Sequence, residues 1–201
     1  MAAPALRVVQ RTVAENTAAA SDAVTAAARR AVGTLVARGE TVAIVESTSG
    51  GLISAAVLGV PGASKVYRGP GFVIYGTGRG SCQPVLRALL DDDALLADLS
   101  DARHKASAAA YLASKEDWTR RLARHLQQRL GATWCIAEGG ATGPTFNIEG
   151  VEQAFSACFV AGPAEDGLVV RSDSLDREAN MRLFAASALD LLADCAEGQK
   201  E

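Results

Sequence analysis

The chain has 201 residues, of which 49% are hydrophobic, and this is enough for one domain with a sizeable core. Its net charge of -3 at pH 7 gives no electrostatic reason to expect a nucleic-acid partner. Since no apolar run in the sequence is long enough to cross a bilayer, we expect no membrane partner and a soluble, cytoplasmic protein.

Residues 1–22 are rich in alanine and contain Arg7 and Arg11, but they have no hydrophobic stretch of the secretory type. We expect a helical extension here, followed by the main domain over residues 23–201. The composition also suggests import into an organelle as an alternative. Glu15 and Asp22 argue against a long transit peptide.

The four cysteines, Cys82, Cys135, Cys158 and Cys195, are scattered and form no Cys-x-x-Cys pair. Metal-ligand spacing is absent as well, so the sequence predicts no metal and no cofactor. We expect reduced, buried thiols in an intracellular protein.

The first periodic segments predict a helix, a strand and a second helix. Apolar residues recur at helical spacing from Ala23 to Arg38, and Gly39 is placed to end that helix. Val42 to Val45 form an uninterrupted apolar run, which is typical of a strand buried on both faces of a parallel sheet. Leu52 to Leu58 then indicate a short helix.

The turn between this strand and helix is strongly polar. It consists of Glu46, Ser47, Thr48, Ser49, Gly50 and Gly51. A helix N-terminus suits a phosphate or a developing oxyanion, and ligands of open α/β sheets collect at the carboxyl ends of the strands. The structural alternative is that these hydroxyls only cap the helix, since the Gly-x-Ser-x-Gly nucleophile spacing is absent.

Two later strands end in similar glycine-rich loops. The apolar run from Phe72 to Tyr75 leads into residues 76–81, and the run from Thr133 to Ala137 leads into residues 138–145. Neither loop fits a phosphate-loop or dinucleotide fingerprint. Three polar loops at one edge of a sheet nevertheless predict a shared crevice.

The remaining elements complete a mixed sheet with outer helices. Helices are predicted over Pro84 to Leu99, with a solvated turn at Asp91 to Asp93 rather than a metal site, and over Arg103 to Leu112. Ser114 to Asp117 resemble a capping box for the helix that follows. Residues 155–161 and 167–171 indicate a hairpin, and residues 176–197 a final helix.

The chain offers no obvious catalytic triad. His104 and His125 have no evident partners, so a Ser47 nucleophile would have to pass its proton elsewhere. The sequence leaves three candidates open for that role, Lys65, Tyr67 and Tyr75.

Arg177 lies in the first turn of the last helix, where a cation opposes the helix dipole. It either binds a phosphate, a role that the Gly140 loop could also take, or pairs with Asp173 or Asp176 at the surface.

An ordered series of segments resembles the CinA C-terminal domain family. They are residues 45–51, 60–64, the run to Tyr75, residues 140–144 and Asp176-Arg177. The resemblance covers roughly Ala23 to Asp194. The chain is most similar to the stand-alone members of the family, which lack the N-terminal domain of the longer members. Members of this family include nicotinamide mononucleotide deamidases.

The resemblance implies a three-layer α/β/α sandwich around a mixed, mostly parallel sheet, often as a homodimer. It also implies hydrolysis of the carboxamide of nicotinamide mononucleotide to nicotinic acid mononucleotide and ammonia, a reaction of pyridine nucleotide metabolism and NAD recycling. Ser47 matches the serine of the family motif, and Tyr75 matches the tyrosine that closes the second strand. The residues implied for substrate binding are Thr48, Ser49, Gly50, Gly51, Gly140, Thr142, Gly143 and Arg177.

Two positions depart from the family pattern. The Tyr-Ser-Asn-x-x-Lys segment of the family is Tyr75 followed by Gly76 to Arg79 here, without the asparagine and the lysine. The threonine that opens the Thr-Gly-Ile-Ala-Gly-Pro loop is Gly139, with Glu138 beside it. A second hypothesis is therefore a family member without catalysis that acts as a nucleotide-binding or interaction subunit.

Overall fold

The computed structural model describes residues 5–14, 16–69, 71–74, 83–100, 102–146 and 148–198. Its elements are β1 (Arg7–Gln10), α1 (Thr17–Arg38), β2 (Val42–Glu46), α2 (Leu52–Leu58), α3 (Ala63–Val66), β3 (Phe72–Val73), α4 (Gln83–Leu90), α5 (Asp93–Ser100), η1 (Ala102–Lys105), α6 (Ala108–Leu130), β4 (Trp134–Ala141), β5 (Ala154–Ala161), β6 (Asp166–Ser172) and α7 (Arg177–Glu197).

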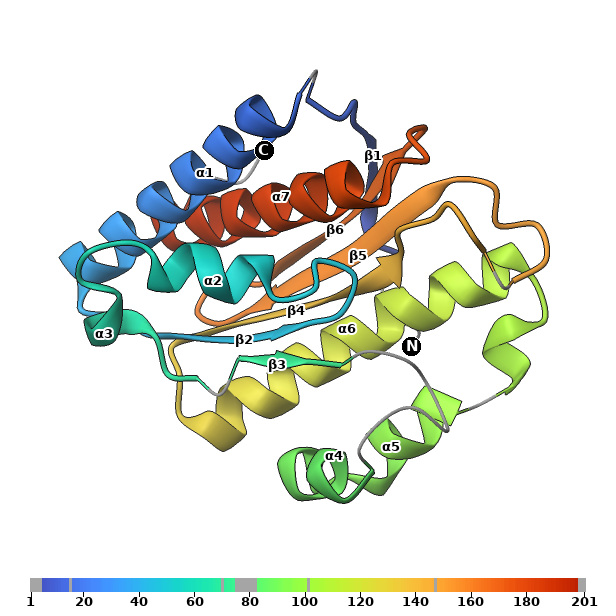
Figure 1. The fold of residues 1–201 in the computed structure, drawn as a ribbon. Helices are drawn as coiled ribbons and strands as arrows, with labels where there is room; N and C mark the ends of the chain where they lie inside the picture. The colour runs from blue at the N-terminus through green and yellow to red at the C-terminus, as the bar shows by residue number, and fades with distance from the viewer. Residues whose placement is uncertain are drawn as a thin grey trace.

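The centre of the protein is a six-stranded sheet in the order β1-β6-β5-β4-β2-β3 (Figure 1). Strand β5 is antiparallel to both of its neighbours, and the other neighbouring pairs are parallel. The prediction of a mixed, mostly parallel sheet is confirmed. The predicted hairpin is the pair β5 and β6.

Helices cover both faces of this sheet (Figure 1). Helices α1, α2 and α7 bury one hydrophobic cluster against it, and α6, with α4 and α5, buries a second cluster against the other face. The protein is therefore the three-layer α/β/α sandwich that the resemblance implied.

Side-chain alternation along β2 and β4 decides which residue meets which layer. Val42 and Ile44 pack in the α1–α7 cluster, and the intervening Ala43 and Val45 pack in the α6 cluster. In β4 the even-numbered Ile136 belongs to the α1–α7 cluster. The same alternation directs Glu138 toward that layer and leaves Gly139 on the α6 side.

The predicted N-terminal helix is wrong for residues 7–10. These residues form the edge strand β1, which pairs in parallel with β6 in the register Arg7 to Leu168. Leu6 just before the strand is buried in the α6 cluster. Helix α1 begins only at Thr17, after Asn16 caps it by accepting a hydrogen bond from the Ala19 amide at 2.9 Å.

The predicted helix break at Ser114 to Asp117 is also wrong. Helix α6 runs without interruption from Ala108 to Leu130, and its N-cap is Ser107, which accepts a hydrogen bond from the Ala110 amide. Trp118, Leu122 and Leu126 form an apolar stripe on this helix, and all three are buried.

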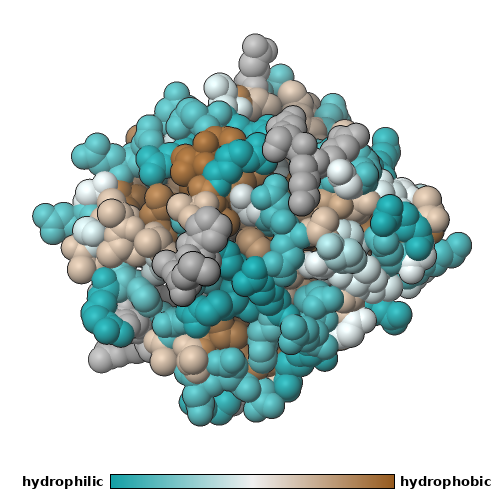
Figure 2. All heavy atoms as spheres, turned by 180° about the vertical axis from the view of Figure 1, so that it is seen from behind, coloured by the Kyte–Doolittle hydropathy of each residue, from teal (hydrophilic) through white to brown (hydrophobic). Residues whose placement is uncertain are grey.

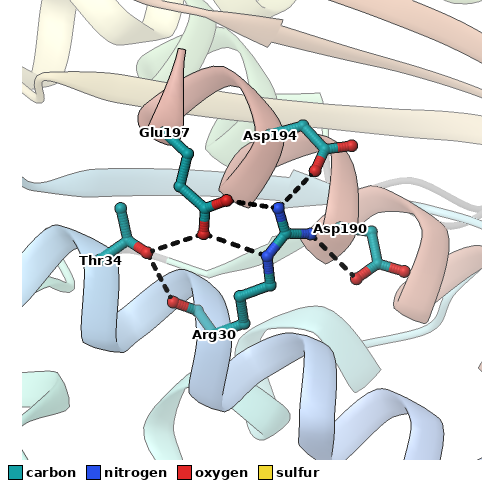
Figure 3. Close-up of polar contacts among 5 residues, drawn as sticks. All are labelled: Arg30, Thr34, Asp190, Asp194 and Glu197. Atoms are coloured by element: carbon teal, nitrogen blue, oxygen red, sulfur yellow. Dashed lines mark hydrogen bonds and ion pairs between the residues drawn. The ribbon is translucent and has the colours of Figure 1, made fainter. Parts of the chain in front are cut away.

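Helices α1 and α7 are joined by an ion-pair network around Arg30 (Figure 3). The Arg30 guanidinium makes two hydrogen bonds with Glu197, at 3.1 and 2.6 Å, and one with Asp194 at 2.6 Å. Asp190 lies 3.9 Å away. The network ties the C-terminal half of α1 to the C-terminal end of α7.

Cys135, Cys158 and Cys195 are buried thiols, as predicted, and burial raises the pKa of the Cys135 thiol to about 12. Cys82 lies outside the described residues.

The face of the molecule in Figure 2 is mostly hydrophilic, with hydrophobic residues in separate areas. Large exposed hydrophobic side chains come from several different elements, namely Val8, Val36, Leu58, Val73 and Leu175. Among the described helices, none combines the length and the apolar character needed to span a membrane.

Candidate active site

Ser47 follows β2 directly and lines a cavity of about 380 Å³ at the carboxyl ends of β2 and β4. The cavity is bounded by the β2–α2 turn, by η1 and α6, by the loop after β4, and by the start of α7. These segments are far apart in the sequence. The predicted shared crevice is present for the loops after β2 and β4, whereas residues 76–81 lie outside the described residues.

Glu138 holds the turn that contains Ser47 through hydrogen bonds to its backbone and side chains. It is buried, and its Oε2 accepts hydrogen bonds from the amides of Ser47 at 3.0 Å and Ser49 at 3.1 Å. The Ser49 hydroxyl donates to the same oxygen at 2.9 Å, and the Thr48 and Ser156 hydroxyls donate to Oε1. Burial raises the pKa of Glu138, and the hydrogen bonds from Ser156, Ser47 and Ser49 oppose that rise.

Glu46 holds the other end of the turn. It is also buried, and its carboxylate accepts hydrogen bonds from the amides of Gly51, Ile53 and Ser54 at 2.9 to 3.0 Å. These amides belong to the beginning of α2 and would otherwise lack partners. The Glu46 side chain is therefore a helix cap and points away from the Ser47 side chain.

These contacts occupy amides that we expected to hold an oxyanion. The Ser49 amide donates to Glu138, the Gly50 amide to the Ser47 carbonyl at 3.1 Å, and the Gly51 amide to Glu46. Ser49 is fully buried. Ser49, Gly50 and Gly51 therefore stabilise the turn and are not among the residues that line the cavity.

Ser47 lies against a strand position that has no side chain. A Cβ placed on Gly139 would lie 3.7 Å from the Ser47 Cβ and 3.9 Å from the Trp118 ring. The space between Ser47 and the Trp118 ring of α6 is therefore wide enough for one small side chain at position 139. The family threonine at this position would fill that space.

Lys115 reaches the same cavity from α6. Its ammonium nitrogen lies 5.1 Å from the centre of the Tyr111 ring and 5.7 Å from that of Trp118. Burial lowers the pKa of Lys115 to about 8, and the nearby Lys105 lowers it as well, while Glu138 raises it. Near pH 8 a large share of Lys115 is therefore uncharged.

The loop after β4 forms the opposite wall with the start of α7. The Tyr111 hydroxyl donates to the Gly140 carbonyl at 3.1 Å, and Arg177 Nη1 donates to the Gly143 carbonyl at 2.9 Å. Asn180 Nδ2 donates to the Thr142 carbonyl at 3.0 Å. The loop is thereby tied to α6 and α7, and Arg177 stays at the cavity edge.

The charged side chains among the described lining residues are all cations, namely Lys105, Lys115 and Arg177. A cavity of this volume with such a lining suits a small anionic ligand.

The structure brings Ser47, Thr48, Gly140, Thr142, Gly143 and Arg177 together around this cavity, out of the residues predicted for the site. Tyr75 lies outside the described residues. Of the other two proposed proton acceptors, Lys65 is exposed on α3 and Tyr67 packs against the α1–α7 cluster. Neither of these two described residues lines the cavity.

Sequence reasoning missed Lys115, Tyr111 and Trp118 as cavity residues. A signal was present, because Tyr111, Lys115, Trp118 and Leu122 recur at helical spacing on one stripe of α6. A lysine in an apolar stripe is unusual, since lysine is almost never buried without a partner.

The comparisons with known proteins point to one family. Residues 24–79, which include Ser47, match the model of the CinA C-terminal domain. A CinA-like protein of Frankia casuarinae is 35% identical over 163 residues, which are 80% of this chain and 33% of that protein. The chain belongs to the CinA C-terminal domain family.

A second CinA-like protein, from Anaeromyxobacter sp. strain Fw109-5, is 34% identical over 161 residues, 80% of this chain and 35% of that protein. The chain thus spans about a third of the length of these curated CinA-like relatives.

Solved CinA superfamily structures share the fold. The competence-damaged protein (CinA) superfamily protein from Klebsiella pneumoniae 700603 superposes with a TM-score of 0.61 at 19% identity, over 87% of this chain and 98% of that one. The corresponding Escherichia coli protein gives a TM-score of 0.60 at 21% identity, over 89% and 91% of the two chains.

Proposed function

We propose that this CinA-family protein is an amidohydrolase that converts the carboxamide of nicotinamide mononucleotide to nicotinic acid mononucleotide and ammonia. The observation that carries the proposal is that Ser47 and three basic side chains line one cavity of about 380 Å³. Cavities of roughly 300 to 1,000 Å³ are typical for small-molecule ligands, and a mononucleotide falls within this class. The identity of the proposed substrate comes from the family resemblance.

The chemistry needs a nucleophile and a route for ammonia. The Ser47 oxygen attacks the carboxamide carbon, and the tetrahedral intermediate then expels ammonia to leave an acyl ester on Ser47. Water hydrolyses this ester to the carboxylate and restores the serine. The fixed turn around Ser47 supports this role, because Glu138 and Glu46 hold its backbone on both sides.

The cations supply the affinity for the phosphate of the substrate. Arg177 lies at the start of α7, where its guanidinium can pair with two phosphate oxygens. Lys105 is exposed on η1 beside the same cavity. We place the phosphate near these two residues and the carboxamide near Ser47.

A second candidate function is nucleotide binding without turnover. The observation that favours it is the engagement of the Ser49, Gly50 and Gly51 amides, which removes them as donors for an oxyanion. In that case the cavity would still bind an anion through its cations.

One experiment separates the two functions. The full chain is incubated with nicotinamide mononucleotide, nicotinic acid mononucleotide is quantified by chromatography, and binding is measured by calorimetry. Hydrolysis predicts product from the intact protein and none above background from Ser47→Ala, which should still bind the substrate. Binding without product in both proteins would favour the second function.

The homodimer that the resemblance implies stays a prediction, which light scattering of the purified chain tests.

A further inference from the structure

We propose that Lys115 of helix α6 is the general base that accepts the hydroxyl proton of Ser47. This inference rests on the part of the proposed function that makes Ser47 the nucleophile. It goes beyond that function because it assigns the proton acceptor to a helix that the sequence motifs do not include.

The alternation of side chains determines the side from which a base can reach Ser47. Glu46 turns toward α2, where its carboxylate is committed to three backbone amides. Ser47, one residue later, lies beside Gly139 on the side of the sheet that α6 covers. A base for Ser47 therefore has to approach from the α6 layer.

Lys115 is the described lysine on α6 that lines this cavity together with Ser47. Gly139 of β4 faces the space between Ser47 and helix α6, since a Cβ at this position would contact both Ser47 and the Trp118 ring. The Lys115 ammonium sits over that same Trp118 ring. The absence of a side chain at Gly139 leaves room between Ser47 and the Trp118 ring, beside the cavity that Lys115 also lines.

Burial and the charge of Lys105 favour the neutral form of Lys115, which a base requires, and they outweigh the opposing effect of Glu138. Within the described part of the chain, the charged and titratable groups around Lys115 are Lys105 from η1, Glu138 from β4, Tyr111 on α6 and Arg177 from α7. Burial lowers the pKa of Lys115 to about 8. A desolvated lysine of this kind can act as a base near neutral pH, and serine–lysine pairs are a known variant of the catalytic triad.

The Lys115 amine alone can carry out each proton transfer that the reaction needs. Neutral Lys115 takes the Ser47 proton as the oxygen bonds to the carboxamide carbon, and the resulting ammonium then donates a proton to the departing nitrogen, which leaves as ammonia. In the second half, Lys115 takes a proton from water as the water oxygen bonds to the acyl carbon. It returns that proton to the Ser47 oxygen when the ester bond breaks.

The test uses a reagent that does not depend on the natural substrate. A small fluorophosphonate forms a bond from its phosphorus to Ser47 Oγ and expels fluoride, and intact-mass measurements give the labelling rate from pH 6.5 to 9.5. The variants are Lys115→Met and Lys115→Arg, of which neither can accept a proton. Lys65→Met, on exposed α3, is the matched control.

We expect the wild-type labelling rate to rise with pH through an inflection near 8, because neutral Lys115 accumulates above its pKa. Both Lys115 variants should label about 100-fold more slowly at pH 8.5, without the inflection. Lys65→Met should behave as wild type. Thermal melting identifies any variant that fails to fold, and the wild-type pH profile remains a test in that case.

A flat wild-type profile, or unchanged labelling in a folded Lys115 variant, would overturn the assignment. Failure of the assignment and of the proposed function are distinguishable. Lys115-dependent labelling without ammonia release from nicotinamide mononucleotide would reject the substrate and keep the Ser47–Lys115 pair. Ammonia release that needs Ser47 but not Lys115 would keep the function and reject the base.

Discussion

Glu138 accepts a hydrogen bond from the backbone amide of Ser47 at 3.0 Å, so a buried carboxylate in β4 positions the candidate nucleophile in the turn that follows the neighbouring strand β2. The same side chain receives the Ser49 amide and three hydroxyl groups. Glu138 thus links the turn after β2 to β4 and, through Ser156, to β5.

Removal of this acceptor should destabilise the fold. Glu138→Ala leaves several buried donors without a partner, and we expect the free energy of unfolding to fall by about 3 kcal/mol. Glu138→Gln keeps one oxygen for the amides, and its amino group can donate to the hydroxyls of Thr48 and Ser156, so it should cost less than about 1 kcal/mol. Urea unfolding of the three proteins checks this. Equal losses for both variants would mean that Glu138 does not organise the turn.

The pH dependence of stability should carry the signature of Glu138. Burial raises its folded-state pKa above the usual 4.5, so the folded protein holds this proton more tightly than the unfolded chain does. The stability from that proton is complete below pH 4.5 and is lost as the pH rises through the folded pKa. The difference in unfolding free energy between wild type and Glu138→Gln should therefore shift against wild type as the pH rises above 4.5. A shift in the opposite direction would mean that Glu138 is ionised more readily than in water.

Adjacent glycines in β4 should respond differently to alanine. A Cβ on Gly140 would lie 2.8 Å from Ser156 Cα and still closer to the Phe155 carbonyl oxygen, which would push β4 and β5 apart. We expect Gly140→Ala to cost about 2 kcal/mol or more. Gly139→Ala introduces only ordinary contacts and should change stability by less than about 1 kcal/mol. Denaturation midpoints of the two variants test this, and similar midpoints would contradict it.

The Arg30 network should stabilise the α1–α7 contact modestly. Arg30→Met removes its hydrogen bonds to Glu197 and Asp194, and we expect a loss of about 1 kcal/mol, since the group is partly exposed. Arg30 lowers the pKa of Glu197 below 4.5, so this stabilisation is complete above pH 4.5 and is lost as the pH falls through the folded pKa. The exposed neighbour Arg29→Met is the control for urea unfolding. Equal effects of both variants at pH 7 would contradict this role.

Arg177 should act on the phosphate of the substrate. In Arg177→Met we expect the KM for nicotinamide mononucleotide to rise about tenfold or more, because a charged hydrogen-bond partner is lost. The KM for nicotinamide riboside, which has no phosphate, should change little and serves as the control. Steady-state kinetics with both compounds test this. An equal rise for both would show that Arg177 only holds the Gly143 loop.

Local sequence patterns were sufficient to predict those helices and strands whose own residues show a clear hydrophobic periodicity. The unbroken apolar run at Val42 to Val45 and the helix from Leu52 to Leu58 appear as predicted, because burial on both faces and helical spacing are visible in consecutive residues. The short edge strand β1 was missed for the opposite reason. Its partner β6 lies more than a hundred residues away, and most of its side chains are exposed.

The site depended on contacts that no local pattern reports. The interpretation of Ser114 to Asp117 as a helix start hid Lys115, which instead lies inside α6 and faces the cavity. Glu138 was recognised as a departure from the family, but its hydrogen bonds join residues from β2, β4 and β5. Only the assembled sheet brings these groups together.

The most direct test of the central claim is the rate of ammonia release from nicotinamide mononucleotide at pH 8.5 by wild-type protein and Ser47→Ala, measured side by side. The account predicts steady release by wild type and a fall of about 1,000-fold or more in the variant. Equal rates in the two proteins, or no release by wild type above the buffer blank, would contradict it.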